Sequence, residues 1–224
     1  MARVVTLLGG ESTGKTTLAN ALVGALAAQG VAATLVPEHL RHWCRQHGRA
    51  PHVHEQAALA REQGRLIDQA AADPATELVI ADTAPLVIAA YSELYFDDRS
   101  LTPGALAWQG RADLTLLGGL DLPWVPDGLF RDSPAVREAT DAVLRRHLQA
   151  AGLPFQTVYG RDGERTAQAL RAIGRLLGRA LVPPPASWIG GRRPWGCEKC
   201  SDPDCEHRLF SALLARDSPG DTRS

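Results

Sequence analysis

The chain contains 224 residues, and its 24 lysines and arginines nearly balance 25 aspartates and glutamates, for a net charge of −1. A chain of this length forms one domain of ordinary size with room for a short appendage. The balanced charge excludes attraction to nucleic acid or to an anionic membrane through bulk charge alone. No apolar run reaches the length of a bilayer span, and the first predicted strand begins too early to leave room for a signal peptide. We therefore expect a cytoplasmic protein without membrane or nucleic-acid partners, whose four cysteines are thiols or metal ligands.

Predicted strands and helices alternate along the first 177 residues. Short apolar runs predict strands at 4–8, 32–36, 78–81, 114–117 and 155–159. Apolar residues at helical spacing predict helices at 17–28, 54–72, 85–95, 135–151 and 164–177. The polar segment 39–51 is predicted as a loop. This alternation is typical of an α/β fold with a parallel sheet covered on both faces.

The composition changes after residue 181. We expect a core domain over residues 1–181, a stiff linker rich in Pro, Gly and Arg over 182–196, a cysteine-rich appendage over 197–216 and a disordered end over 217–224.

A glycine-rich motif follows the first predicted strand. Residues 9–16 read Gly-Gly-Glu-Ser-Thr-Gly-Lys-Thr, which fits the phosphate-binding P-loop pattern G-x-x-x-x-G-K-[ST]. A strand before it and a helix after it are the context that lets backbone N–H groups and the helix N-terminus face a polyphosphate. The residues expected to bind ATP are Gly9, Gly10, Glu11, Ser12, Thr13, Gly14, Lys15, Thr16 and Thr17.

Lys15 is supported by composition as well as by the motif. The chain has only two lysines, Lys15 and Lys199, and uses arginine for its other cations. A compact ammonium on a flexible stem suits contact with the β- and γ-phosphates better than a planar guanidinium does. We expect the hydroxyl of the next residue, Thr16, to bind Mg²⁺.

Two acidic residues follow predicted strands, at the edge where parallel sheets bind ligands. Asp82 comes directly after the third strand and could hold Mg²⁺, although it could also cap the next helix. Glu38 follows the second strand, with Arg41 three residues later. It could accept the proton of an attacking hydroxyl, or it could be an exposed loop acid.

Aromatic and basic residues further along could complete a site. Tyr91 and Tyr95 share one face of a predicted helix, where they could stack on a base or pack in the core. The loop over 121–132 contains Trp124 and ends near Arg131, with Arg137 just beyond. The loop could close over a transferring phosphoryl group with an arginine stabilising its charge, or it could be an ordinary connection with a buried tryptophan.

Together these residues resemble the ribosylnicotinamide-kinase-like P-loop family of AAA-type ATPases and kinases. In bacteria this is the kinase domain of the bifunctional regulators of NAD biosynthesis. The resemblance runs from residue 4 to about residue 177. It rests on the glycine motif, Glu38-x-x-Arg41, Asp82-Thr83, the tyrosine-containing end of the next helix, and Trp124-Val125-x-Asp127-Gly128.

The resemblance implies a nucleotide-kinase-like fold with strand order 2-3-1-4-5, with ATP and Mg²⁺ at the P-loop. It also implies phosphoryl transfer to the 5′-hydroxyl of nicotinamide riboside, for NAD salvage. Catalytic roles fall on Lys15, Glu38, Asp82 and Arg131, substrate-binding roles on Glu38, Arg41, Tyr95, Trp124 and Asp127, and metal-binding roles on Thr16 and Asp82. Pro37 stands where the family has an aromatic residue that stacks on nicotinamide, so one face of the expected ring sandwich is missing unless Trp43 or His39 replaces it.

Two further clusters invite a metal interpretation. Five of the seven histidines fall between residues 39 and 54, where the polar pattern favours a solvated loop over a metal site. Near the C-terminus, Cys197, Cys200, Cys205 and His207 form C-x₂-C-x₄-C-x-H, four ligands that could hold a structural Zn²⁺. A redox-active cysteine pair and a disordered tail are the alternatives.

Two functions follow from these patterns. The first is a small-molecule kinase that transfers a phosphoryl group from ATP to a nucleoside. The second is an ATP-binding switch in which nucleotide occupancy changes how the zinc-binding tail engages a partner. Pro37 and the tail favour the switch, and the residues at the strand ends favour the kinase.

Overall fold

The computed structural model describes residues 1–125, 133–161 and 163–183. Asp127, Arg131 and the four cysteine-tail ligands, Cys197, Cys200, Cys205 and His207, lie outside these residues. The roles expected for them therefore stay predictions.

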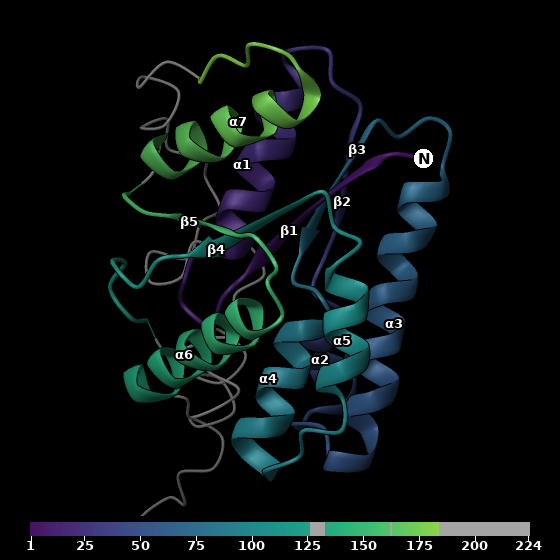
Figure 1. Cartoon of the computed structure of the whole chain (residues 1–224), viewed down its shortest axis with the longest axis vertical. Helices are drawn as coiled ribbons and strands as arrows, with labels where there is room; N and C mark the ends of the chain where they lie inside the picture. Colours follow the sequence, from purple (N-terminus) through teal and green to yellow (C-terminus); the bar gives the residue numbers. More distant parts are fainter. Residues whose placement is uncertain (126–132, 162, 184–224) are drawn as a thin grey trace, which may run out of the picture.

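Five parallel strands form one sheet at the centre of the molecule (Figure 1). They are β1 (Arg3–Leu8), β2 (Ala33–Val36), β3 (Leu78–Asp82), β4 (Leu114–Gly118) and β5 (Gln156–Val158). Their order is β2-β3-β1-β4-β5, so the topology expected from the sequence is confirmed. Leu7 lies opposite Asp82 in the ladder, which brings the end of β3 beside the start of the glycine motif.

Side chains alternate between the two faces of the sheet along each strand, and helices cover both faces, so both are buried. On one face, α1 (Lys15–Ala27) and α7 (Gly163–Leu177) pack over a core that includes Leu7, Ile80 and Leu116. On the other face, α3 (Val53–Ala72) covers Val79 and Ala81. Next to α3, α5 (Thr102–Gln109) and α6 (Pro134–Ala150) enclose Leu8 and Leu117.

The remaining helices extend the molecule beyond the carboxyl ends of the strands. These are α2 (His39–His47) and α4 (Pro85–Phe96), which lie with the first half of α3 in the lower part of Figure 1. Leu59 and Ala60 of α3 form a small apolar cluster with Ile88 of α4, against which Leu40 and Trp43 of α2 pack. This helical layer forms a wall next to the ends of β2 and β3.

Two helices were not expected. The segment 39–51 was predicted as a loop, which is wrong, because residues 39–47 form α2. Leu40, Trp43 and Cys44 have helical spacing and bury one face, while Gly48 ends the helix in a left-handed conformation. The short helix α5 was also missed, because it spans eight residues and contains a proline and a glycine.

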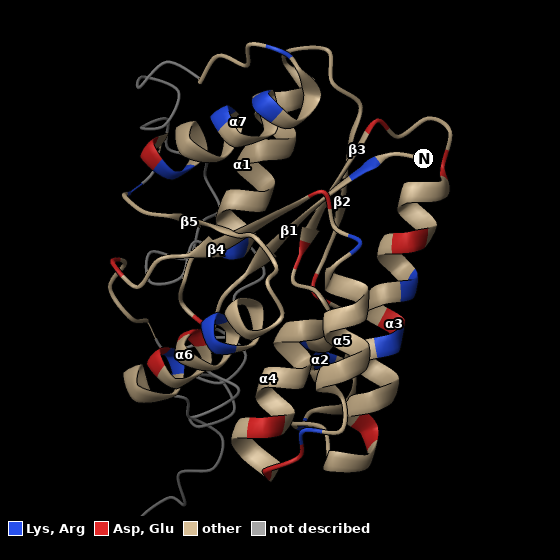
Figure 2. Ribbon diagram, viewed as in Figure 1, with Lys and Arg blue, Asp and Glu red and all other residues tan. Residues whose placement is uncertain are grey.

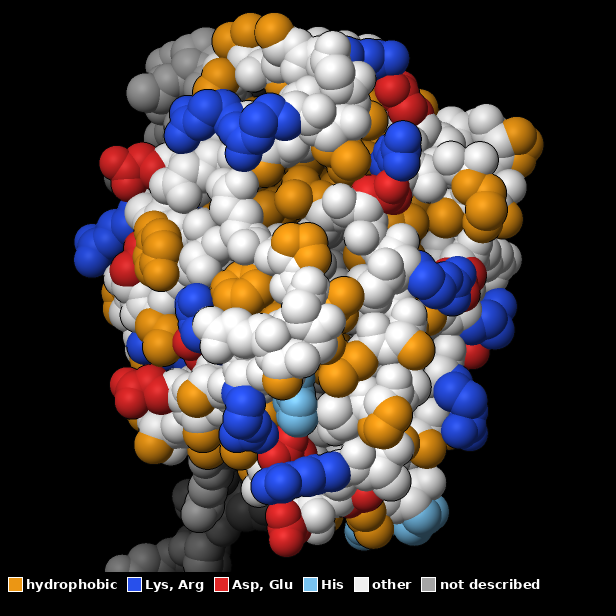
Figure 3. All heavy atoms as spheres, in the orientation of Figure 1, with side chains coloured by type: hydrophobic (Ala, Val, Ile, Leu, Met, Phe, Trp, Pro, Cys, Tyr) orange, Lys and Arg blue, Asp and Glu red, His pale blue; other side chains and the backbone are white. Residues whose placement is uncertain are grey.

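Charged side chains of both signs are mixed on the outer faces of the helices, as Figure 2 shows for α3 and α6. In the view of Figure 3, acidic and basic side chains alternate with apolar ones and form no broad area of one sign. Within the described part of the chain, no helix is both long and apolar enough to span a membrane. The same residues contain no cluster of three metal-ligating side chains.

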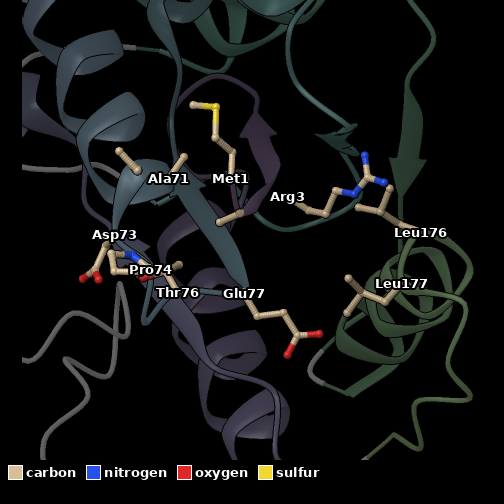
Figure 4. A pocket seen from close by; sticks show the side chains of 11 residues that line it. Met1, Arg3, Ala71, Asp73, Pro74, Thr76, Glu77, Leu176 and Leu177 are labelled. Carbon is tan, nitrogen blue, oxygen red and sulfur yellow. The ribbon is translucent and has the colours of Figure 1, made fainter.

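A cavity of about 530 Å³ lies at the amino-terminal edge of the sheet, next to the ends of α3 and α7 (Figure 4). Three charged side chains line it, and each has a partner: Asp73 accepts from the backbone N–H of Ala75 at 2.9 Å, and Arg3 and Glu77 form ion pairs. Arg3 lies 2.6 Å from Asp113, and Glu77 lies 2.9 Å from Arg179. Parallel sheets bind ligands at their carboxyl edge, so this cavity is not the candidate site.

Candidate functional site

The glycine motif forms a tight loop between β1 and α1. Gly9 and Gly14 have φ angles of 144° and 74°, which side-chain-bearing residues rarely adopt. A Cβ on Gly9 would lie 2.7 Å from the hydroxyl of Thr13, and one on Gly14 would lie 2.8 Å from Leu122. The loop therefore requires glycine at both positions.

The ammonium of Lys15 folds back onto its own loop. Its Nζ donates to the carbonyl oxygen of Gly10 at 2.9 Å, and the hydroxyl of Thr13 donates to the same oxygen at 2.7 Å. The residue is only 8% exposed. A buried cation held by a neutral carbonyl is poised to bind an anion, which is what a phosphate-binding loop needs.

Thr16 and Asp82, the two residues predicted to bind Mg²⁺, meet at the start of α1. The hydroxyl of Thr16 donates to Oδ2 of Asp82 at 2.6 Å. The second oxygen of Asp82, Oδ1, is buried and has no hydrogen-bond partner within the described residues. A carboxylate and a hydroxyl are ligands that Mg²⁺ prefers, so these two side chains fit a magnesium ion.

Glu38 lies close to the same point. Burial, and then the charge of the nearby Glu38 carboxylate, raise the pKa of Asp82 above its ordinary value. Glu38 precedes α2 and forms an ion pair with Arg41 at 3.5 Å. The ends of β2 and β3 thus bring Glu38 close to Asp82, which also lies near Lys15 and bonds to Thr16.

A buried glutamine on α3 connects these strand ends. Gln63 is fully buried, and its Oε1 accepts from the backbone N–H of His39 at 2.8 Å. Its Nε2 donates to the carbonyl oxygens of Pro37 and Thr83, at 3.4 Å each. Sequence analysis missed Gln63, since a glutamine inside a helix carries no motif.

A buried arginine on α7 connects the loops on the opposite side of the glycine motif. Arg165 is 4% exposed, and its guanidinium donates to the carbonyl oxygens of Thr13, Gly119 and Gly160. It also pairs with Asp121, whose other oxygen accepts from the backbone of Gly160. Arg165 thereby joins the loops that follow β1, β4 and β5, and it was also missed from the sequence.

A second arginine lies against the glycine loop from α6. Arg137 is 8% exposed, and its Nη1 donates to the carbonyl oxygen of Leu122 at 2.8 Å. A Cβ on Gly10 would approach the Cα of Arg137 to 3.3 Å. Its Nε is buried without a hydrogen-bond partner among the described residues. Its charge is therefore available to an anion on the loop.

The start of the loop after β4 reaches the glycine motif. The hydroxyl of Ser12 donates to the backbone carbonyl of Val125 and accepts from its N–H at 3.3 Å. Trp124 is half-buried, with an indole N–H that has no partner within the described residues. The described start of this segment therefore lies next to the P-loop.

The aromatic residues expected near the acceptor differ in how much of each side chain is exposed. Tyr91 is 8% exposed, whereas Tyr95 is 48% exposed, with ring centroids 6.1 Å apart. Trp43 stacks on His47 at 3.9 Å, so its ring is engaged within α2. Burial lowers the pKa of His39, whose ring interacts with charges on α3. The replacement of the missing aromatic ring at Pro37 by Trp43 or His39 therefore stays a prediction.

The parallel sheet, the glycine loop and the buried lysine define a P-loop nucleotide-binding protein. The chain belongs to the AAA domain family, whose model matches residues 4–165. The family resemblance inferred from the sequence is thereby confirmed. A search of curated proteins finds no match.

Solved structures with a similar fold include NadR proteins. One, a NadR protein in complex with NAD and AMP-PNP, has a TM-score of 0.65 and 21% sequence identity over 82% of this chain. Another, a NadR protein in complex with NR, has a TM-score of 0.65 and 23% identity over 81% of this chain. The matched regions cover 51% and 53% of those structures, so this chain spans about half their length.

Proposed function

We propose that this chain is an ATP-dependent kinase that transfers the γ-phosphoryl group to the 5′-hydroxyl of a nucleoside, with nicotinamide riboside as the first candidate. The observation that carries the proposal is the meeting of Lys15, Thr16, Asp82 and Glu38 at one edge of the sheet. The NadR structures support it, because they have this fold and contain AMP-PNP or NR, which are ligands that such a reaction would use.

The nucleotide lies on the glycine loop in this proposal, over residues Gly9–Thr17. Lys15 exchanges the Gly10 carbonyl for phosphate oxygens, and Arg137 supplies a second positive charge beside the loop. Thr16 and Asp82 hold Mg²⁺, which would neutralise charge on the phosphates. Arg131, outside the described residues, keeps its predicted role at the transferring group.

The acceptor lies between the end of β2 and α4. Glu38 accepts the proton of the attacking hydroxyl, Arg41 keeps the carboxylate oriented, and Tyr95 contacts the base through its exposed ring. Trp124 and Asp127 belong to the loop that closes over the acceptor. Most of the rate enhancement comes from positioning and charge stabilisation, since phosphoryl transfer requires little covalent chemistry from the protein.

A nucleoside panel tests this proposal. Purified protein is incubated with ATP·Mg²⁺ and each nucleoside, beginning with nicotinamide riboside, while ADP release is followed. We expect release that depends on one acceptor and that Lys15→Ala lowers at least about 100-fold, with an unchanged circular dichroism spectrum. ADP release that no nucleoside stimulates would contradict the kinase and support the ATP-binding switch.

A further inference from the structure

We propose that Gln63 is a positioning residue that holds the carboxylates of Glu38 and Asp82 in register for metal binding and phosphoryl transfer. The inference rests on the proposed function. Gln63 touches neither carboxylate, and it acts on the backbone that carries them.

The side-chain amide of Gln63 binds both neighbours of Glu38. Its oxygen accepts from the N–H of His39, and its nitrogen donates to the carbonyl of Pro37. Glu38 is therefore held between two anchored peptide groups where β2 gives way to α2. The same nitrogen donates to the carbonyl of Thr83, directly after Asp82. One side chain thus ties the end of β2 to the end of β3.

The backbone after Asp82 needs such an anchor because it is strained. Thr83 has a φ angle of 87°, in the region that β-branched residues avoid. Strain of this kind persists only where the surrounding structure over-determines it. Thr83 is held by its own N–H, which donates to the carbonyl of Leu7 at 3.2 Å, and by Gln63 at its carbonyl. Removing Gln63 frees one end of this turn, and Asp82 loses its fixed direction.

Only an amide can make this set of bonds. The group at position 63 must accept from one N–H and donate to two carbonyls in a site with no exposure to water. Leucine offers neither function, while an ionised carboxylate keeps the acceptor and places its charge against two carbonyl oxygens.

The same helix provides a matched control. Gln56 lies seven residues earlier on α3, is 3% exposed, and has a buried Oε1 without a partner among the described residues. Gln56→Leu removes a buried amide of the same size that makes no hydrogen bond to either strand end within the described residues. It therefore reports the cost of losing a buried glutamine from α3 without the anchoring that we assign to Gln63.

The experiment compares full-length wild type, Gln63→Leu, Gln63→Glu and Gln56→Leu. Calorimetric titration gives the affinity for AMP-PNP in EDTA and in Mg²⁺, and steady-state assays give kcat and KM for the acceptor that the nucleoside panel identifies. In EDTA, we expect Gln63→Leu to bind AMP-PNP within about twofold of wild type, because the glycine loop is untouched. We expect the increase in AMP-PNP affinity on adding Mg²⁺ to be at least about tenfold smaller than in wild type. We also expect kcat to fall at least about tenfold. Gln56→Leu should match wild type in both.

The outcomes are decisive in each direction. The inference is overturned if Gln63→Leu keeps the Mg²⁺ gain, or if Gln56→Leu loses it equally. It is also overturned if wild type shows no Mg²⁺ gain, because Asp82 then holds no metal. Gln63→Glu, which retains the bond to His39, replaces the leucine variant if that variant does not fold. If wild type shows no acceptor-dependent ADP release, the proposed kinase fails, while the AMP-PNP titrations still decide the role of Gln63.

Discussion

The two halves of the candidate site are built differently. The nucleotide half is built on one continuous motif, residues 9–16, which forms the turn after β1 and the first residues of α1. Bonds from Thr13 and Lys15 to the carbonyl of Gly10 close this turn. The acceptor half has no continuous motif. It combines Glu38 at the end of β2 with Tyr95 near the end of α4, and the packing of the helices sets their relative positions. Because the two halves are built separately, substitutions in the nucleotide half should change the binding of ATP, and substitutions in the acceptor half should change the use of the acceptor.

Replacing the candidate base should separate the halves most strongly. Glu38→Gln keeps the shape of the side chain and removes its ability to take a proton, so we expect kcat to fall about 100-fold. The affinity for AMP-PNP should stay within about twofold of wild type. Single-turnover assays and calorimetric titration measure the two quantities. Glu62→Gln, on the outer side of α3 in an ion pair with Arg65, is the control. An equal loss of nucleotide affinity in Glu38→Gln would contradict the separation.

Arg165 provides the reciprocal test on the nucleotide half. Arg165→Lys keeps the charge but cannot reach the three loop carbonyls and Asp121 together. We expect KM for ATP to rise about tenfold, while KM for the acceptor is unchanged. Arg175→Lys, two to three turns later on α7 and exposed, should behave as wild type. A rise in the acceptor KM of the same size would show that the loops after β4 and β5 serve both halves.

Tyr95 tests the acceptor half at its exposed edge. Tyr95→Ala removes a ring that is 48% exposed, and we expect KM for the acceptor to rise about 3–10-fold with KM for ATP unchanged. Phe96→Ala is the control, because Phe96 is the next residue and has a similar exposure of 40%. If both variants raise the acceptor KM equally, the effect belongs to the end of α4 and not to the ring of Tyr95.

Asp82 gives a smaller effect that is measured as stability. Burial and the charge of Glu38 raise the pKa of Asp82 in the folded chain above the ordinary value of 3.8. The unfolded chain therefore releases this proton more readily, so the ionised carboxylate costs stability above its folded pKa and costs none below about 3.8. We expect Asp82→Asn to raise the Tm of nucleotide-free protein at about pH 7.5. The rise should be about 2–4 °C for each kcal/mol by which the substitution increases the free energy of unfolding.

The difference in Tm should shrink as the pH falls below the folded pKa of Asp82, and should be lost below the ordinary value of 3.8, where aspartate is protonated in both states. Differential scanning fluorimetry across this range measures it. Asp68→Asn, in a surface ion pair with Arg111, is the control and should change Tm little. A lower Tm for Asp82→Asn at neutral pH would show that the carboxylate stabilises the free protein.

The same contrast explains what could be predicted from the sequence. The strands and the glycine loop depend on local patterns, so they were found, whereas the strand order followed from the family resemblance. The loop predicted over residues 39–51 was wrong because polar composition outweighed the helical spacing of Leu40, Trp43 and Cys44. Gln63 and Arg165 could not be found, since their roles exist only once α3 and α7 pack against the ends of the strands. Glu38 was identified from its place after a strand, but its approach to Asp82 depends on the register of β2 and β3.

The most direct test of the kinase assignment is the fate of the transferred phosphorus. ³¹P NMR of wild-type protein with ATP, Mg²⁺ and nicotinamide riboside should show a new phosphate monoester resonance that grows in equal amount with ADP. That resonance should be absent with Lys15→Ala. If ADP instead appears with an equal amount of inorganic phosphate, or not at all, and the rest of the nucleoside panel also gives no monoester, the chain does not transfer phosphoryl groups to nucleosides and the central claim is contradicted.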